Sequence, residues 1–264
     1  MLSKLVNRIR GNWLRRRFFL ARWVNGKVPV HNISWLPDSF IVRRLAGTGV
    51  SMVENFCSAE EAEEVINTAR GRLKKSGVIL EGKFQETPGR ISDTARLFSA
   101  DYRHETLYPL MQRASMLVGL PYTHLEDVYV TRYKEGGLYN EHLDFGEGFS
   151  TDRLYTVLLY LNTLPESQGG STVFPHLNAA VQPRVGRAVT WTNKNPDGSG
   201  HFEASHAAFP VRDGGEKWVI QFWFRRYPMQ KPIPDIELLQ ARPGIPLEEQ
   251  DTLPDGVRYT DEGG

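Results

Sequence analysis

Three side chains in the second half of the chain have the types and order of a metal-binding set. His142 and Asp144 are two residues apart, and His206 follows farther along the chain. Side chains two residues apart point to the same side of a β-strand, so His142 and Asp144 can chelate one ion without backbone strain. Two imidazoles and one carboxylate can occupy one face of an iron ion and leave the opposite face open. The three residues therefore predict a metal-dependent enzyme.

Each part of this set is weak evidence by itself. A His-x-Asp triplet occurs by chance and is usually a polar surface feature. A lone histidine in a β region is more often a hydrogen-bonded structural residue. His201, five residues before His206, competes for the role of the third ligand, whereas His104, His124 and His176 have no comparable setting.

Lys217 strengthens the case for a reactive site. It lies at the head of the apolar run 218–224, which has the composition of a strand. An unpaired ammonium pointing into a core is costly, so an inward Lys217 requires an anion. A dicarboxylate such as 2-oxoglutarate would supply one beside the metal. The alternative is that Lys217 faces solvent at the start of the strand.

The elements that must position these residues change in character at about residue 126. Ser58 and Glu61 form a capping-box pattern ahead of a helical apolar stripe, and a second helix fits residues 104–119, ended by Gly119. Residues 77–100 have the mixed composition of strands and loops. Four β-branched and aromatic runs follow, at 128–130, 155–161, 188–192 and 218–224.

Helices followed by many short strands favour a mainly β fold with flanking helices. The best fit is a jelly-roll core of two antiparallel sheets, with the N-terminal helices packed on one of them. We expect a basic leader over residues 1–30, a domain over 31–228 whose motif-bearing barrel begins at about 126, and a Pro-rich acidic tail over 229–264.

The charge is distributed unevenly along the chain. The leader has eight basic residues and no acidic one, so the rest, in a total of +1, carries −7. The leader is interpreted as an amphipathic helix on an anionic membrane surface, an organelle transit peptide or a solvated arm. The acidic remainder disfavours a groove that tracks nucleic-acid phosphates.

Composition constrains the compartment only slightly. The single cysteine, Cys57, excludes an internal disulfide framework, and no apolar run reaches the roughly 18 residues of a membrane span. The leader does not have the pattern of a secretory signal. These features favour a soluble, cytoplasmic protein, with organelle targeting by the leader as the alternative, and they do not indicate an oligomeric state.

Four ordered motif blocks carry a family resemblance over about residues 50–228. They are residues 133–145, with two tyrosines and a glycine turn before His-x-Asp, and residues 169–175, 185–191 and 205–219. Together they resemble the catalytic alpha subunits of prolyl 4-hydroxylases. That resemblance implies an Fe(II)/2-oxoglutarate dioxygenase with a double-stranded β-helix core.

The resemblance also implies roles for individual residues. His142, Asp144 and His206 would bind iron, and Lys217 would pair with the distal carboxylate of 2-oxoglutarate. Tyr133 would hydrogen-bond the same carboxylate, and Thr172 would line its pocket. Four further positions are similar to substrate-pocket residues, although barrel packing or surface charge explains each of them equally well: Tyr139, Arg153, Glu126 and Trp223.

The implied reaction is hydroxylation of a prolyl residue at its 4-position in a protein or peptide. It would consume O₂ and 2-oxoglutarate and release succinate and CO₂, with ascorbate keeping the iron reduced. One alternative is a dioxygenase for another side chain or a small molecule, because the metal and co-substrate motifs do not encode the substrate. Another is a degenerate barrel that serves as a binding module, which the complete His-Asp-His-Lys set argues against.

Overall fold

The computed structural model describes residues 30–31, 40–45, 48–80, 83–97, 101, 105–146 and 152–230. Nearly all of the expected leader and tail lie outside these residues, so both remain predictions. Within the described part of the chain, no helix is long and apolar enough to cross a membrane.

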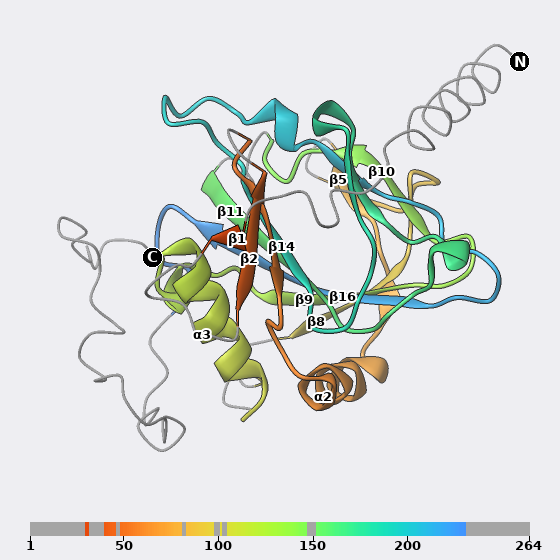
Figure 1. Ribbon diagram of the computed structural model, residues 1–264. Coiled ribbons are helices and arrows are strands. Elements are labelled where there is room, and N and C mark those ends of the chain that lie inside the picture. The colour runs from red at the N-terminus through yellow and green to blue at the C-terminus, as the bar shows by residue number, and fades with distance from the viewer. Residues whose placement is uncertain are drawn as a thin grey trace, which may run out of the picture.

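Two antiparallel sheets form most of the structure (Figure 1). The larger sheet has nine strands, in the order β1 (Val30–His31), β2 (Ile41–Leu45), β3 (Val50–Glu54), β14 (Ala188–Thr192), β11 (Arg153–Tyr160), β16 (Lys217–Arg225), β9 (Val128–Tyr133), β8 (Asp93–Leu97) and β4 (Lys74–Lys75). The smaller sheet has five, in the order β13 (Ala179–Val181), β12 (Thr172–Phe174), β15 (His206–Ala208), β10 (Leu138–His142) and β7 (Arg90–Ile91). A separate hairpin pairs β5 (Val78–Leu80) with β6 (Lys83–Gln85).

Two α-helices occur among the described residues, close to where the sequence predicts them. Helix α2 (Ala59–Arg70) begins with the predicted capping box: the Ser58 hydroxyl accepts from the Glu61 amide at 3.1 Å, and the Glu61 carboxylate accepts from the Ser58 amide at 2.9 Å. Helix α3 (Leu107–Val118) starts three residues later than predicted and ends at Gly119, whose φ of 73° is left-handed. Short 3₁₀ turns are η2 (Tyr122–His124), η4 (Glu166–Gln168), η5 (Pro175–Leu177) and η6 (Phe202–Ala204).

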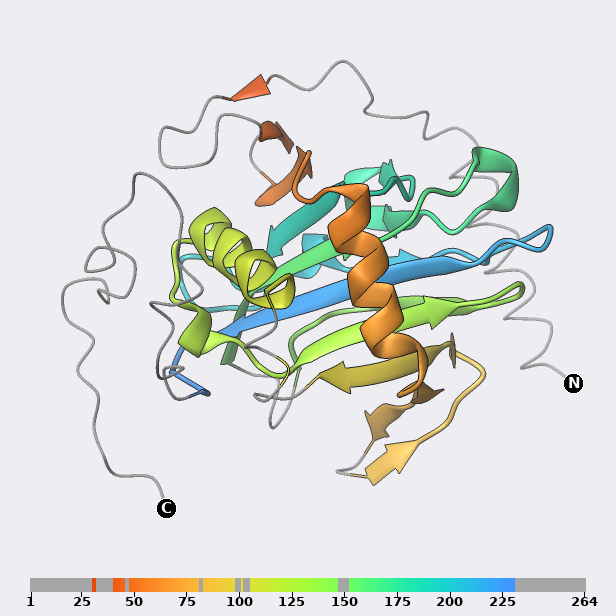
Figure 2. The same cartoon turned by 90° about the horizontal axis from the view of Figure 1, so that it is seen from below.

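The period of two along β16 decides which side chains face the helices and which face the smaller sheet. Trp218, Ile220, Phe222 and Phe224 belong to the apolar cluster that contains the buried apolar residues of α2 and α3. Both helices lie across one face of the larger sheet (Figure 2). Val219 belongs to a second cluster between the two sheets. The prediction of a mainly β fold with flanking helices on one sheet is therefore confirmed.

The sequence pattern missed β2 and β3, which precede the expected start of the strand region. These five-residue strands pair with each other, and β3 also pairs with β14, with Val53 opposite Ala188. The second partner of β3, strand β14, is far away in sequence, so local composition carries little information about that pairing.

Candidate metal and co-substrate site

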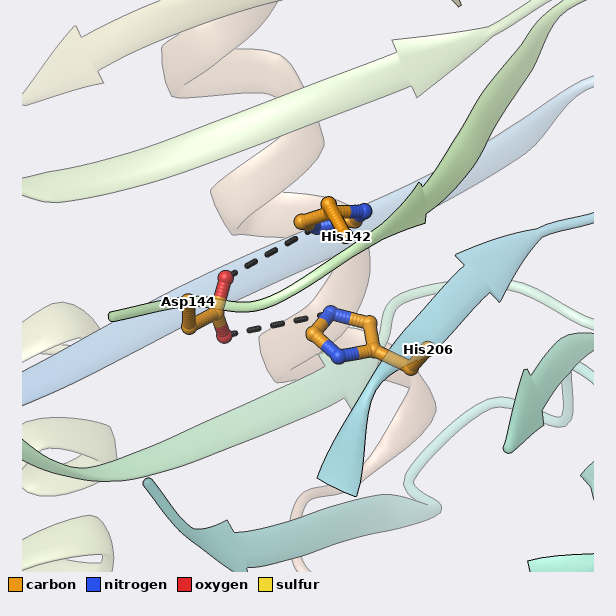
Figure 3. A group of neighbouring side chains, drawn as sticks. All are labelled: His142, Asp144 and His206. Atoms are coloured by element: carbon orange, nitrogen blue, oxygen red, sulfur yellow. Dashed lines mark ion pairs between the residues drawn. The ribbon is translucent and has the colours of Figure 1, made fainter. Parts of the chain in front are cut away.

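His142, Asp144 and His206 converge between the two sheets, as Figure 3 shows. His142 is the last residue of β10 and His206 the first of β15, and the two are paired across neighbouring antiparallel strands. Asp144 follows the end of β10, so it comes from a loop and not from the strand that the sequence predicts. One ligand atom from each residue lies within 4.8 Å of the others, so the group could hold a metal ion.

Backbone hydrogen bonds orient both imidazoles. Nδ1 of His142 lies 2.8 Å from the carbonyl oxygen of Asn140, and Nδ1 of His206 lies 3.1 Å from that of Ala204. A neutral ring that donates from Nδ1 presents Nε2 as a lone-pair ligand. The Nε2 atoms lie 3.7 Å (His142) and 3.9 Å (His206) from the oxygens of Asp144, which lies beside the two rings with one oxygen toward each.

Two buried polar residues that the sequence analysis missed hold the carboxylate of Asp144. The Thr156 hydroxyl donates to Oδ2 of Asp144 at 2.7 Å, and Nδ2 of Asn193 donates to Oγ1 of Thr156 at 3.0 Å. All three side chains are buried. Such support orients a metal ligand before the metal binds. Neither residue lies in a metal-ligand pattern, so only their contacts identify them.

The electrostatics of the cluster also favour metal binding. Burial and the neighbouring His206 lower the pKa of His142 to about 3, so His142 is neutral at physiological pH. Burial alone would raise the pKa of Asp144, but His206, His142 and Arg153 together keep it below its usual value. The site therefore presents a lone pair and a carboxylate to a cation without first having to lose protons.

Lys217 points inward and is only 1% exposed, which decides between its two sequence interpretations. Nζ lies 3.5 Å from the hydroxyl of Thr172 and over the rings of Tyr133 and Tyr160, 5.1 and 5.5 Å from their centroids. No carboxylate among the described residues lies within ion-pair distance of it. Burial lowers the pKa of Lys217 to about 7. A buried ammonium without an anion fits the carboxylate of a bound ligand.

The predicted neighbours of this ammonium are present. Tyr133 on β9 lies directly across from Lys217 in the sheet, and Thr172 opens β12 on the facing sheet. Burial raises the pKa of Tyr133 to about 12, so its phenol keeps its proton and can donate a hydrogen bond. Tyr160, which the sequence analysis did not single out, closes the pocket from β11.

The four predicted substrate residues are also brought close to the cluster. Nε and Nη2 of Arg153 donate to the two carboxylate oxygens of Glu126, each at 2.7 Å, and Nη1 donates to the backbone oxygen of Asp144 at 3.1 Å. The guanidinium lies 4.0 Å from the ring centroid of Trp223. The ring of Tyr139 stacks on that of His142 at 3.6 Å.

Aromatic and cationic residues that the sequence analysis missed complete the walls. Trp191 and Phe174 have ring centroids 4.5 and 5.8 Å from that of His206. Arg90 on β7 lies over the outer face of Tyr139, 4.6 Å from the ring centroid. These residues are far apart in sequence and share no spacing with the triad.

The competing histidines lie elsewhere or outside the described residues. Nδ1 of His201 contacts the backbone and side-chain oxygens of Thr192, at 2.9 and 3.0 Å. His124 contacts the carbonyl oxygen of Arg225, and the exposed His176 pairs with Glu141 at 3.1 Å. None of these three belongs to the metal-type cluster.

Residues 128–225 match the model of the 2OG-Fe(II) oxygenase superfamily. The chain is 36% identical over 177 residues to the prolyl 4-hydroxylase subunit alpha-1 of Gallus gallus, a match that covers 63% of this chain and 33% of that protein. It is 28% identical over 220 residues to the probable prolyl 4-hydroxylase 10 of Arabidopsis thaliana, a match that covers 74% of this chain and 71% of that protein. The chain thus spans about a third of the length of the animal subunits it matches.

Two solved structures are similar in fold. The viral collagen prolyl hydroxylase of Paramecium Bursaria Chlorella virus-1, in complex with 2OG, has a TM-score of 0.56 and 27% identity, covering 69% of this chain and 98% of that one. A Pseudomonas putida prolyl-4-hydroxylase has a TM-score of 0.52 and 25% identity, and the match covers 69% of this chain and 95% of that one. The chain is thus similar in sequence and fold to prolyl 4-hydroxylases, and the segment that holds the triad and the buried lysine, residues 128–225, matches the 2OG-Fe(II) oxygenase superfamily.

Proposed function

We propose that this protein is an Fe(II)- and 2-oxoglutarate-dependent dioxygenase that hydroxylates prolyl residues at the 4-position in a protein or peptide. The observation that carries the proposal is the convergence of His142, Asp144 and His206 in the same intersheet space as a buried Lys217, which has no carboxylate partner in the described part of the chain. The prolyl hydroxylases among the relatives and solved structures support the choice of substrate. The core would be a double-stranded β-helix, for which the two facing antiparallel sheets are suitable.

Each group at the site would have a distinct part in binding. His142, Asp144 and His206 would hold Fe(II), which supplies the power to activate O₂ and oxidise an unactivated C–H bond when 2-oxoglutarate is bound. Lys217 would pair with the distal carboxylate of 2-oxoglutarate, with hydrogen bonds from Tyr133 and Thr172. The buried walls would keep water from the reaction. Ascorbate would keep the iron reduced between turnovers.

The substrate would enter next to Asp144. A prolyl ring has no N–H to donate, so apolar and aromatic surfaces must hold it. Tyr139, stacked on His142, and Trp223, under the Arg153 guanidinium, provide such surfaces, and the Arg153–Glu126 pair holds Trp223 in place. We propose these four residues as the substrate pocket.

The test is an assay of the purified protein with Fe(II), ascorbate, 2-oxoglutarate and proline-rich peptides. We expect succinate to form and the peptide to gain the mass of one oxygen atom, which fragmentation places on proline. His142→Ala and Asp144→Ala should abolish both signals, whereas His176→Ala, on an exposed histidine outside the cluster, should not.

Two results would speak against the proposal. If no peptide led to succinate, or if Asp144→Ala still turned over, the proposal of an Fe(II)-dependent dioxygenase would be wrong. An oxygen placed on another side chain would keep the dioxygenase and favour the second candidate, hydroxylation of a residue other than proline.

A further inference from the structure

Five side chains form a continuous hydrogen-bonded chain that ends between the two sheets. The links are 2.8 Å from Ser92 to Ser76, 2.7 Å from Ser76 to Thr94, 3.0 Å from Thr94 to Thr131, and 3.0 Å from Thr131 to Gln221. At the outer end, Ser76 and Ser92 line a cavity of about 460 Å³ at the edges of β4 and β7. At the inner end, Thr131 and Gln221 are 0% and 6% exposed.

The chain has a single direction. Each hydroxyl has one proton to donate, and Ser92 donates its proton to Ser76. Thr131 donates its one proton to Gln221, so Thr94 must donate to Thr131, and Ser76 to Thr94. Thr131 donates to Oε1 of Gln221, so the carbonyl side of that amide is occupied. The NH₂ group of Gln221 is thereby turned away from Thr131, and it has no acceptor among the described residues.

The register of β16 places Gln221 between the anion-binding and metal-binding ends of the site. Its side chain lies on the same face of the strand as that of Lys217, four residues or about 13 Å along the strand. In the neighbouring strand β11, Gln221 is opposite Leu158. Two residues before Leu158 is Thr156, whose hydroxyl holds Asp144. A ligand that spans from Lys217 to the triad therefore passes Gln221.

We propose that Gln221 is a further co-substrate-binding residue, whose amide NH₂ donates a hydrogen bond to the anionic ligand held by Lys217, and that Thr131 and the serine–threonine chain fix its orientation. The proposal rests on the proposed function, because that function supplies the ligand, 2-oxoglutarate. A carboxylate or keto oxygen of that ligand would give the NH₂ group the acceptor that it does not find among the described residues.

Calorimetric titration of 2-oxoglutarate into the Mn²⁺-loaded protein tests this without turnover. Gln221→Leu removes the donor and should weaken binding about 10-fold, the usual loss for one hydrogen bond to a charged group. Gln221→Glu keeps the shape but turns an acceptor toward the anion, so it should weaken binding more than Gln221→Leu. Thr131→Val frees the amide to rotate and should weaken binding by a smaller factor, whereas Thr131→Ser should restore it.

The outcomes separate this proposal from the proposed function. If wild type binds 2-oxoglutarate, Lys217→Ala weakens binding, and Gln221→Leu and Thr131→Val bind as wild type does, then Gln221 has no such role and the proposed function stands. If wild type with Mn²⁺ does not bind 2-oxoglutarate, both fail. The melting temperature of each ligand-free variant shows whether it is folded. A variant that melts as wild type does but binds more weakly supports direct contact.

Discussion

At the residue scale, the chemistry depends on charged groups that the fold removes from water. Lys217 has no carboxylate partner among the described residues, whereas Asp144 accepts a hydrogen bond from Thr156 and faces two imidazoles. The first arrangement leaves a positive charge to be neutralised by a ligand, and the second prepares a negative charge for a metal. Together they would suit a cation and an anion bound side by side.

The lowered pKa of Lys217 predicts how binding of 2-oxoglutarate depends on pH. Below about pH 7 the ammonium is already charged, but above it the free protein must take up a proton to pair with the dianion. Affinity should therefore fall by up to about tenfold per pH unit above pH 7. Titration of the Mn²⁺-loaded protein at pH 7, 8 and 9 measures this. Lys217→Arg, which stays charged, should remove the slope, and an equally flat profile in wild type would contradict the prediction.

The lowered pKa of Lys217 also makes the free energy of unfolding depend on pH, and here the effect is a rise with pH, whereas the affinity for 2-oxoglutarate falls. Because the pKa in the folded state is about 7 and the ordinary value is 10.5, the unfolded chain binds more protons than the folded one between these values. The contribution of Lys217 to the free energy of unfolding therefore rises with pH across this window. The groups that surround the ammonium are Tyr133, Tyr160 and Thr172. None of them is negatively charged, so none of them offsets the effect of burial on the pKa of Lys217.

Thr156 should control metal affinity although it is not a ligand. Thr156→Val keeps the shape of the side chain but removes the hydroxyl that holds Oδ2 of Asp144. Loss of such support usually weakens metal binding 10- to 100-fold. Titration with Mn²⁺ monitored by calorimetry measures the change, and Thr156→Ser, which retains the hydroxyl, is the control. Equal affinity in the Val and Ser variants would mean that the hydroxyl does not position the carboxylate.

At the element scale, the first turn of helix α2 is joined to helix α3. Glu61 accepts from the Ser58 amide and also binds both terminal nitrogens of Arg113 on α3, at 2.8 and 2.7 Å. Arg113 in turn donates to the backbone oxygen of Phe56. The capping box that the sequence predicts is thus also the point at which the two helices are joined.

Removal of the cap should destabilise the protein without altering the site. Ser58→Ala leaves the Glu61 amide without its side-chain acceptor, and we expect the free energy of unfolding to fall by about 1 kcal/mol. Urea denaturation measures this, and Ser58→Asp, which can still cap the helix, should stay close to wild type. If folded Ser58→Ala protein bound Mn²⁺ more weakly than wild type, the prediction that the cap does not affect the site would be wrong.

At the scale of the whole molecule, the metal would connect the two sheets. His142 and His206 come from strands of the smaller sheet, whereas Asp144 is held by Thr156 of the larger one. Any ion that binds only the folded state stabilises it, by about 2.7 kcal/mol at a concentration one hundred times the dissociation constant. We therefore expect Mn²⁺ to raise the melting temperature and EDTA to reverse the rise. Asp144→Ala should show neither effect, and a rise of the same size in that variant would place the ion elsewhere.

The sequence by itself determined the parts of this protein that are encoded locally. Ser58 and Glu61 predict the start of α2 because a capping box is made within four residues. The spacing of His142 and Asp144 predicts a pair of metal ligands, because it lies within three residues. The apolar run that follows Lys217 likewise predicts an inward-pointing cation from neighbouring residues alone. The ordered motif blocks predict the family, since they preserve local chemistry around the site.

Only the tertiary structure decided the contacts made between distant segments. Whether His206 or His201 joins the triad depends on the pairing of β15 with β10, and β2 and β3 acquire their place from β14. The hydrogen bonds that hold Asp144 and Gln221 likewise join residues on different strands. Such contacts have no sequence period, because each exists only after chain closure has brought two segments together.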